Sequence, residues 1–310
     1  MKRIPAKAPR AAEAAPGVFG ERIGQFREHL SLERRLGDHT VRSYVMDLTQ
    51  YERFLAGRGK KRGAAIRPED VEAYVTGRAW AASTVARKIA SLRAFHEFLR
   101  RRGYAEDNPA LQIRPPRQSR PLPDVLAVAE VEALVQAPRG EAPAAIRDRA
   151  MLELAYAAGL RVTELVRLTL EEVDLEEDLV RCFGKRSRER VVPFGAKAKA
   201  ALVRYLDSAR AHFLRDRSER SLFLTRLGRR FTRMGYWKLL EGYRRAAGIE
   251  RPISPHTLRH TCATHLLEGG CDLRVVQEFL GHRSIETTRI YTHLDRNYLR
   301  AEYKQFHPRA

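Results

Sequence analysis

Ser254-Pro255-His256-Thr257-Leu258-Arg259-His260 is the most informative stretch of the chain. Serine is a good N-cap and proline a good first residue, so a helix is predicted to begin here. His256 and Arg259 are three positions apart, which places them on one face of that helix. An imidazole and a guanidinium near a helix N-terminus predict a site for an anion.

Downstream, a second helix is predicted to begin at Asp272 and to end at Gly281, because glycine is a suitable residue after a helix C-terminus. His282 follows directly. Tyr291 lies nine residues beyond His282.

Two more cations lie upstream. Arg161 comes two residues after Gly159, which is predicted to end a helix. Lys185 comes 24 residues later, at the tip of a predicted hairpin between strands 179–183 and 191–193.

These blocks, in this order and at these spacings, resemble the tyrosine recombinases of the phage integrase family, and specifically the bacterial Xer recombinases. The resemblance covers nearly the whole chain, including residues 40–48, the run 147–150 and the last four residues, 307–310. The family's ordered set of arginine, lysine, histidine-x-x-arginine, histidine and tyrosine is matched by Arg161, Lys185, His256, Arg259, His282 and Tyr291.

The resemblance implies an enzyme that cuts and rejoins duplex DNA, with Tyr291 as nucleophile and a 3′-phosphotyrosine intermediate. Transfer of a phosphodiester to tyrosine concentrates negative charge on the nonbridging oxygens, which Arg161 and Arg259 can clamp. Because these guanidiniums supply the positive charge, we expect no metal and no other cofactor. The covalent intermediate keeps the energy of the phosphodiester bond, so religation needs no ATP.

The remaining family positions imply proton transfer and hydrogen bonding. Lys185 is the expected proton donor to the leaving 5′-oxygen. Arg186 and Arg188 are alternative cations beside it, in a hairpin where family members often have a second glycine. His256 is expected to help deprotonate the tyrosine, whose ordinary pKa is about 10. His282 is expected to donate a hydrogen bond to a nonbridging oxygen.

The charge of the chain points to a polyanion as its partner. Lys and Arg number 58 against 38 Asp and Glu, which gives a formal net charge of +20 over 310 residues. Such an excess opposes compaction unless a regularly charged polyanion such as DNA binds. A ribosome-associated or simply basic protein would carry a similar charge.

The chain is long enough for two domains. We predict a disordered basic tail over 1–17, a helical domain over 18–111, a proline-rich basic linker over 112–123 and a catalytic domain over 124–310. A surface loop is the alternative to the linker. The expected fold class is mainly α: a four-helix, SAM-like core-binding domain that clamps DNA, and a mixed, mostly helical catalytic domain with a small antiparallel sheet.

Helical periodicity predicts four segments in the first domain, the second of them capped by Asp38 or Thr40, and places Arg87, Lys88 and Arg93 on basic polar faces. In the second domain the pattern predicts helices at 144–159, 162–168, 196–209, 232–247, 255–267, 273–280, 285–293 and after 295, and a short strand pair at 222–224 and around 231.

Other functions fit parts of the pattern. A zinc site could use His256, His260 and His265, but H-E-x-x-H is absent, and we expect His260 and His265 to pack between helices. Residues 273–280 and 285–291 resemble the helix-turn-helix of a non-catalytic regulator, which would not need the six chemical residues. Among enzymes, a mobile-element integrase is the runner-up. It is disfavoured because large phage integrases often carry an additional arm-binding domain, whereas only about 17 residues precede the first predicted helix here. A type IB topoisomerase shares the chemistry.

The resemblance also implies partners: double-stranded DNA with a two-arm recombination site, a paralogous Xer recombinase in a tetramer, and a septal DNA translocase. Which of the two Xer paralogues the chain resembles more stays open. Leu299, Tyr303 and Phe306 form one stripe of a C-terminal helix. That helix docks either on its own domain or, as the resemblance implies, on a neighbouring protomer.

Cys182, Cys262 and Cys271 form no C-x-x-C pair, which is typical of a reducing compartment. The chain shows neither a signal peptide nor an apolar run of the roughly 18 residues that a membrane span needs. We therefore expect a cytoplasmic, nucleoid-associated protein with no membrane partner.

Overall fold

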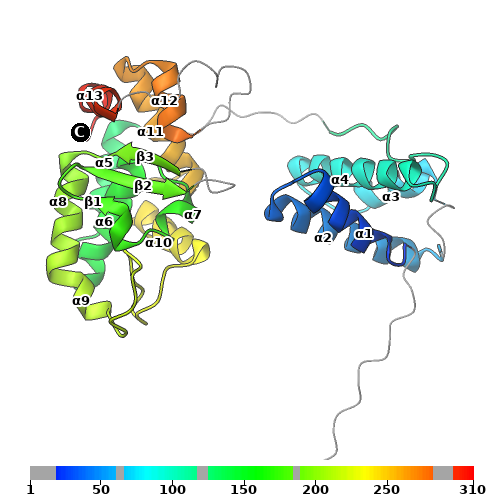
Figure 1. Ribbon diagram of the computed structural model, residues 1–310, viewed down its shortest axis with the longest axis horizontal. Coiled ribbons are helices and arrows are strands. Elements are labelled where there is room, and N and C mark those ends of the chain that lie inside the picture. Colours follow the sequence, from blue (N-terminus) through cyan, green and yellow to red (C-terminus); the bar gives the residue numbers. More distant parts are fainter. Residues whose placement is uncertain (1–18, 61–65, 117–124, 184–188, 282–295) are drawn as a thin grey trace, which may run out of the picture. The chain divides into compact units, whose positions relative to one another are not determined.

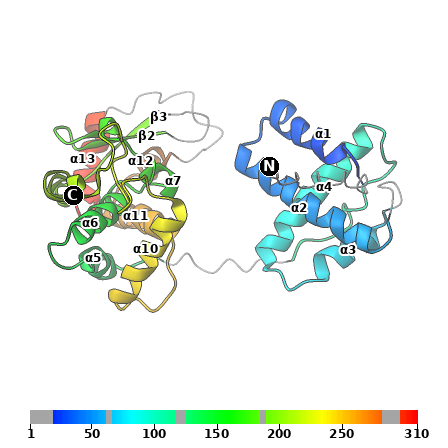
Figure 2. The same ribbon diagram turned by 90° about the horizontal axis from the view of Figure 1, so that it is seen from below.

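The computed structural model describes residues 19–60, 66–116, 125–183, 189–281 and 296–310. The chain divides into two compact units, residues 1–120 and 121–310 (Figure 1; Figure 2). Both are mainly helical and the second holds a small antiparallel sheet, so the predicted fold class is confirmed. The division falls within the predicted linker, and the predicted tail lies outside the described residues. No helix of the described ranges combines the length and the apolar character that crossing a membrane requires.

The first unit has the four predicted helical segments around one core. Leu48 and Phe95 are completely buried in it. Its second helix is capped by Gly37, not by the predicted Asp38 or Thr40. The elements are α1 (Arg22–Glu28), which continues as the π-helical η1 (His29–Glu33), α2 (Asp38–Gly57), α3 (Pro68–Thr76) and α4 (Ala82–Arg101).

The prediction that Lys88 lies on a basic polar face is wrong, because its side chain is buried. Its ammonium donates to Asp47 at 3.0 Å, to Gln50 at 2.7 Å and to the Tyr74 hydroxyl at 3.1 Å. Asp47 is itself fully buried and also pairs with Arg87. A buried charge is costly unless it is paired and hydrogen-bonded, so this cluster compensates both signs of charge. Lys88 therefore joins α4 to α2 and α3.

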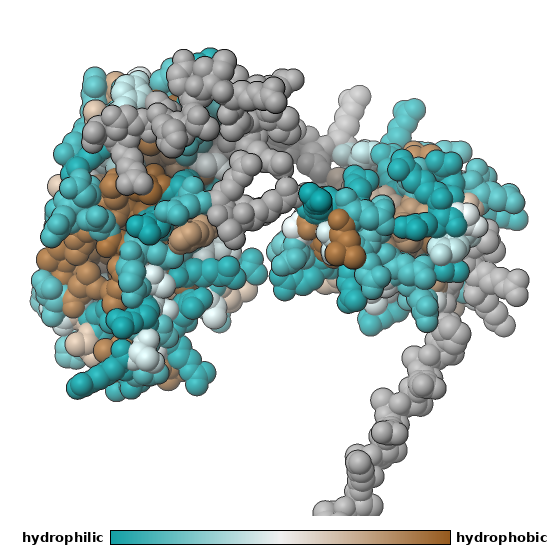
Figure 3. Space-filling model, viewed as in Figure 1, coloured by the Kyte–Doolittle hydropathy of each residue, from teal (hydrophilic) through white to brown (hydrophobic). Residues whose placement is uncertain are grey.

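Arg93 is also engaged within its own unit. Its guanidinium donates to the main-chain carbonyls of Ala110, Leu111 and Ile113. The bond to Ile113 holds the start of the predicted linker against the helical domain. The visible surface of both units is nevertheless largely hydrophilic (Figure 3).

The second unit is built around α6. Residues 150–158 are buried without exception, which is typical of a helix enclosed on all sides. Helices α5, α8 and α11 pack against it (Figure 1; Figure 2). The helices of this unit are α5 (Val128–Gln136), α6 (Pro143–Ala157), α7 (Val162–Leu165), η3 (Leu170–Glu172), α8 (Ala196–Arg204), the π-helical η5 (Tyr205–Ala209), α9 (Arg210–Phe213), α10 (Arg233–Ala246), α11 (Pro255–Gly269), α12 (Leu273–Leu280) and α13 (Arg296–Phe306).

The sheet contains the predicted hairpin. Strands β1 (Val173–Asp174), β2 (Leu179–Phe183) and β3 (Glu189–Pro193) pair antiparallel in the order β1-β2-β3. Val180 and Cys182 face the core and alternate with exposed positions, the pattern of a strand with one buried face. Phe183 pairs with Glu189, and residues 184–188 between them lie outside the described residues.

Some predictions for this unit are wrong. Helix α7 ends at Leu165 instead of 168, and α5 and β1 were not predicted. The strand pair expected near 222–231 is reduced to isolated bridges, Leu224 with Arg230 and Ser221 with Thr169. The helix predicted at 285–293 lies outside the described residues.

The C-terminal helix docks on its own unit. Helix α13 packs on α11, α12 and β3 (Figure 1), and Tyr303 is 2% exposed and stacks on Phe279. The last residues continue into the core, where Arg309 forms a buried two-point ion pair with Glu153. A Cβ atom on Gly195 would lie only 2.1 Å from the Arg309 carbonyl oxygen, so this close approach requires glycine. The sequence left two docking sites open for this helix, its own domain or a neighbouring protomer. In the single chain it docks on its own domain.

Candidate active site

Helix α11 begins where the sequence predicts. The Ser254 hydroxyl accepts a hydrogen bond from the Thr257 amide at 3.2 Å, and Pro255 is the first helical residue. His256, in the first turn, is exposed, whereas Arg259 is only 6% exposed. The helix therefore directs the guanidinium into the unit.

Helix α12 also has its predicted ends. The Asp272 carboxylate caps the first turn by accepting from the Arg274 amide at 2.7 Å. Gly281 ends the helix with φ at +63°, a left-handed conformation that glycine adopts without strain. The last carbonyls of a helix have no partner within it, so the end of α12 presents acceptors to neighbouring donors.

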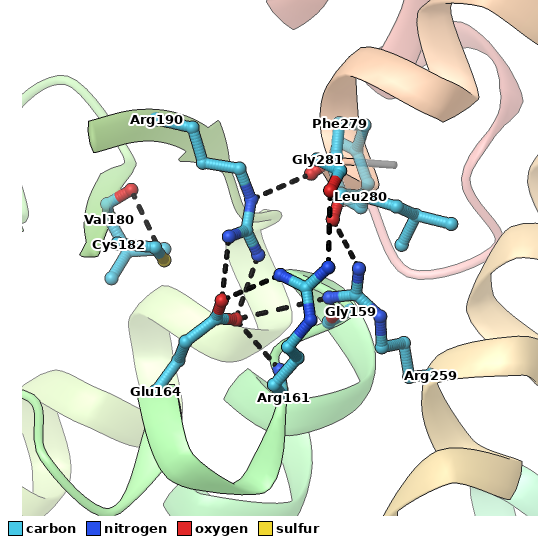
Figure 4. A network of polar contacts seen from close by, with 10 residues as sticks. All are labelled: Gly159, Arg161, Glu164, Val180, Cys182, Arg190, Arg259, Phe279, Leu280 and Gly281. Atoms are coloured by element: carbon cyan, nitrogen blue, oxygen red, sulfur yellow. Dashed lines mark hydrogen bonds and ion pairs between the residues drawn. The ribbon is translucent and has the colours of Figure 1, made fainter. Parts of the chain in front are cut away.

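Three arginines satisfy those acceptors, each from a different part of the chain (Figure 4). They come from the N-terminus of α7, from β3 and from α11. Cations near a helix C-terminus are also favoured by the helix dipole. The pairs are Arg190 with the Phe279 carbonyl, Arg259 with the Leu280 carbonyl and Arg161 with the Gly281 carbonyl.

The carboxylate of Glu164 lies among the same arginines. It accepts from the Arg161 amide at 2.8 Å and from the Arg161 guanidinium at 2.9 Å. Arg190 adds a two-point contact at 2.7 and 2.8 Å, and Arg259 Nη1 lies 3.9 Å away. Burial alone would raise the pKa of Glu164, but the hydrogen bonds and charge of Arg190 and the hydrogen bonds of Arg161 lower it to about 2.

The cluster therefore keeps a positive charge. Burial, together with the charges of Arg161 and Arg190, lowers the pKa of Arg259 to about 10, so this guanidinium stays protonated at neutral pH. Three guanidiniums surround one ionised carboxylate (Figure 4). The Arg161 side chain is 34% exposed and each guanidinium has five N–H donors, so the cluster can receive an anion from solvent.

The structure places three of the six predicted site residues. Arg161 and Arg259 come together around Glu164, and His256 lies in solvent at the start of α11. Lys185, His282 and Tyr291 lie outside the described residues, although Gly281 immediately precedes His282.

Sequence reasoning did not identify Glu164 or Arg190. Glu164 had a local signal, because a glutamate three positions after a helix N-cap can accept the N-cap amide, as it does here. Arg190 had none, since its partner lies 26 positions away.

The histidines proposed for zinc are arranged differently from a metal site. His265 is buried and its Nδ1 lies 2.6 Å from the Tyr156 hydroxyl, as expected of a structural histidine. His260 is exposed, so the expectation that it packs between helices is wrong. Within the described ranges, no three His, Cys, Asp or Glu side chains gather as metal ligands would.

Comparisons with known proteins agree with this geometry. Residues 124–297 match the phage integrase family, and residues 23–103 match the phage integrase N-terminal SAM-like domain. A protein named tyrosine recombinase XerD from Halalkalibacterium halodurans is 41% identical over 93% of this chain and 98% of its own length. A Pseudomonas aeruginosa protein of the same name is 43% identical over 93% of this chain and 97% of its own.

Solved structures share the fold. The XerH recombinase bound to its palindromic difH substrate has a TM-score of 0.67 at 23% identity, covering 90% of this chain and 83% of that one. A lambda integrase tetramer on a Holliday junction has a TM-score of 0.68 at 16% identity, covering 89% and 80%. With an arginine cluster at the end of α12 and matches over both units, this chain belongs to the phage integrase family and is a tyrosine site-specific DNA recombinase.

Proposed function

We propose that this recombinase acts at a two-arm, dif-like chromosomal site and resolves chromosome dimers during segregation. Support comes from the XerD name shared by relatives that are 41 to 43% identical over 93% of the chain. The observation that carries the chemistry is the Arg161–Arg259 pair, held around Glu164 at the end of the helix that leads into His282.

In this proposal the two guanidiniums bind the nonbridging oxygens of the scissile phosphate. The Tyr291 oxygen attacks phosphorus, the bond to the 5′-oxygen breaks, and that oxygen leaves with a proton. Positioned donors of this kind contribute about 3 kcal/mol each to the transition state. The full set of residues is Arg161 and Arg259 as the clamp, Lys185 as proton donor, His256 as base, His282 as hydrogen-bond donor and Tyr291 as nucleophile.

We infer partners of the same kind. Four protomers would exchange strands, with a paralogous recombinase supplying two of them and a septal DNA translocase controlling them. The protein would then act on the nucleoid. The C-terminal helix, which occupies its own domain in the single chain, would dock on the neighbouring protomer within the tetramer.

The test is a covalent adduct with a nicked duplex, in which the nick prevents religation. The wild-type protein should form a 3′-phosphotyrosine adduct, and Tyr291→Phe should bind the same DNA without forming it. Tyr298→Phe is the matched control, because Tyr298 is an exposed tyrosine seven residues further on. An adduct formed by the Tyr291→Phe variant would refute the assignment.

Sequencing the chromosomal DNA trapped on the wild-type protein tests the biological role. A single inverted-repeat site per chromosome would support dimer resolution. Recovery of the ends of a mobile element would replace that role with integration.

A further inference from the structure

Arg190 is the cation of the cluster that matches none of the six recombinase positions. It is the second residue of β3, and its side chain is 12% exposed. Its Nη atoms hold both oxygens of Glu164, and its Nε donates to the Phe279 carbonyl at 3.2 Å. Its Cδ lies 3.1 Å from where a Cβ on Gly281 would stand, so its stem passes directly over that glycine.

The negative charge of Glu164 needs a counter-ion, and Arg190 provides it. Glu164 binds the amide and the guanidinium of Arg161, which fixes the orientation of that side chain. A carboxylate in this place would also cancel about one positive charge beside the phosphate site, and at short range in a buried cluster this is a strong effect. Arg190 is a second, two-point partner of this carboxylate, and its positive charge offsets the charge that Glu164 would cancel.

The distances fit this division of roles. Arg190 lies 2.7 Å from Glu164 and faces both oxygens, whereas Arg259 is 3.9 Å away. Arg259 instead donates to the carbonyls of Gly159 and Leu280. The carboxylate is thus paired mainly with Arg190, and the charge of Arg259 is not neutralised by Glu164 at short range.

We propose that Arg190 is a positioning residue of the recombination site, the counter-ion that lets Glu164 orient Arg161 without neutralising the charge that Arg161 and Arg259 offer to the scissile phosphate. This inference rests on the proposed role of those two arginines. Arg190 does not touch the phosphate; it acts through Glu164 and through the end of α12.

The first test replaces Arg190 and measures the rate of adduct formation on the nicked duplex. Arg190→Gln should slow it about 10- to 100-fold, the loss expected when a catalytic donor is displaced by about 1 Å. Arg190→Lys keeps the charge but not the fork that holds two oxygens, so its rate should fall between those of Arg190→Gln and the wild type. Thermal unfolding and one-arm DNA binding show whether each variant is folded.

The matched control is Arg244→Gln. Arg244 is 12% exposed like Arg190, forms a two-point pair with Glu241 and donates to main-chain carbonyls, but it lies in the last turn of α10. Its loss removes a comparable structural ion pair. The adduct rate of this control should stay near that of the wild type.

A neutral substrate separates positioning from folding. Replacing one nonbridging oxygen of the scissile phosphate by methyl gives a methylphosphonate, which has no charge for the arginines to bind. If Arg190 preserves the positive charge of the site, the defect of Arg190→Gln should shrink to about threefold or less on this linkage. An equal defect on both linkages would mean that Arg190 only supports the fold.

A double variant tests the counter-ion role directly. Glu164→Gln with Arg190→Gln removes both charges and leaves no unpaired buried ion, so it should react faster than Arg190→Gln alone. Multiplicative losses would overturn the proposal. Absence of a wild-type adduct would instead refute the proposed function, whereas a wild-type adduct with an unimpaired Arg190→Gln would refute only this inference.

Discussion

The guanidinium of Arg161 donates a hydrogen bond to the main-chain carbonyl of Gly281 at 3.1 Å, although 120 positions separate the two residues. Arg161 caps the N-terminus of α7, and Gly281 ends α12 immediately before His282. The contact joins two of the segments of the chain that hold the predicted recombinase residues. Displacing either helix end would move an arginine of the cluster.

Even the conservative substitution Arg259→Lys should impair cleavage. Its guanidinium reaches the carbonyls of Gly159 and Leu280 together, a geometry that a single ammonium cannot reproduce. We expect Arg259→Lys to bind DNA almost normally but to form the Tyr291 adduct about 100- to 1,000-fold more slowly, the loss typical of removing one transition-state donor. Single-turnover rates on the nicked duplex, beside binding titrations, measure this. A rate within about threefold of wild type would contradict the clamp.

Cleavage should not need a divalent metal. In the proposed mechanism Arg161 and Arg259 provide the positive charge that a metal ion supplies in other phosphoryl-transfer sites. The adduct should therefore form at the same rate in excess EDTA as in magnesium. The measurement is the adduct rate after dialysis against EDTA, followed by addition of magnesium or zinc. Activity that EDTA abolishes and a metal restores would overturn this mechanism.

The parts of the fold that sequence predicted well have local signals. Ser254 and Asp272 cap their helices, and Gly281 has the positive φ expected after a helix. The β2–β3 hairpin follows from two short apolar runs around a polar turn. In each case the residues that determine the structure lie within a few positions of it.

The parts that were missed depend on distant partners. Lys88 reads as a surface cation, but Asp47, 41 positions earlier, binds it in the core. Helix α5 has alanine as its N-cap, and Glu130 in its first turn is held by Arg251, 121 positions away. Local patterns contain no record of such pairs, and the Glu164–Arg190 contact was missed for the same reason.

The docked tail should loosen in acid because of His307. This ring is 5% exposed and stacks on Tyr303, and burial, with smaller effects of His265 and Arg309, lowers its pKa to about 3. Below about pH 6.5, the ordinary pKa of histidine, His307 binds a proton in the unfolded chain, whereas in the folded chain it stays neutral until about pH 3. The free energy of unfolding should therefore fall as the pH drops from about 6.5 towards 3, by roughly 3 kcal/mol at pH 4.5.

Urea unfolding at pH 7.5 and pH 4.5 measures that loss. His307→Phe, which cannot titrate, should lose less stability between the two pH values, although the lowered pKa of His265 leaves a residual slope. His260→Gln, at an exposed position, is the control and should behave as the wild type. Equal acid sensitivity of the wild type and the His307→Phe variant would assign the effect to other groups.

The buried pair of Arg309 and Glu153 offers a way to detect tail exchange between protomers. Deleting the tail is a poor test, because Tyr303 and Arg309 are core residues of the single chain and their loss would destabilise it. Neutralising one partner keeps the apolar contacts of the tail but leaves one buried charge without its partner, so thermal unfolding must first show that each variant is folded. Arg309→Gln weakens the tail and keeps its groove, whereas Glu153→Gln weakens the groove and keeps the tail.

If the tail of one protomer docks in the groove of the next, each variant alone should lose cooperative binding to two-arm DNA while keeping one-arm binding. An equal mixture should recover part of that cooperativity, because the intact tail of the Glu153→Gln protein can then meet the intact groove of the Arg309→Gln protein. Such head-to-tail contacts close into a ring when the rotation between protomers allows it. Gel-shift titrations on one-arm and two-arm duplexes, with the adduct rate measured in parallel, decide the matter. A mixture no more cooperative than either variant alone would mean that the C-terminal segment serves only its own domain.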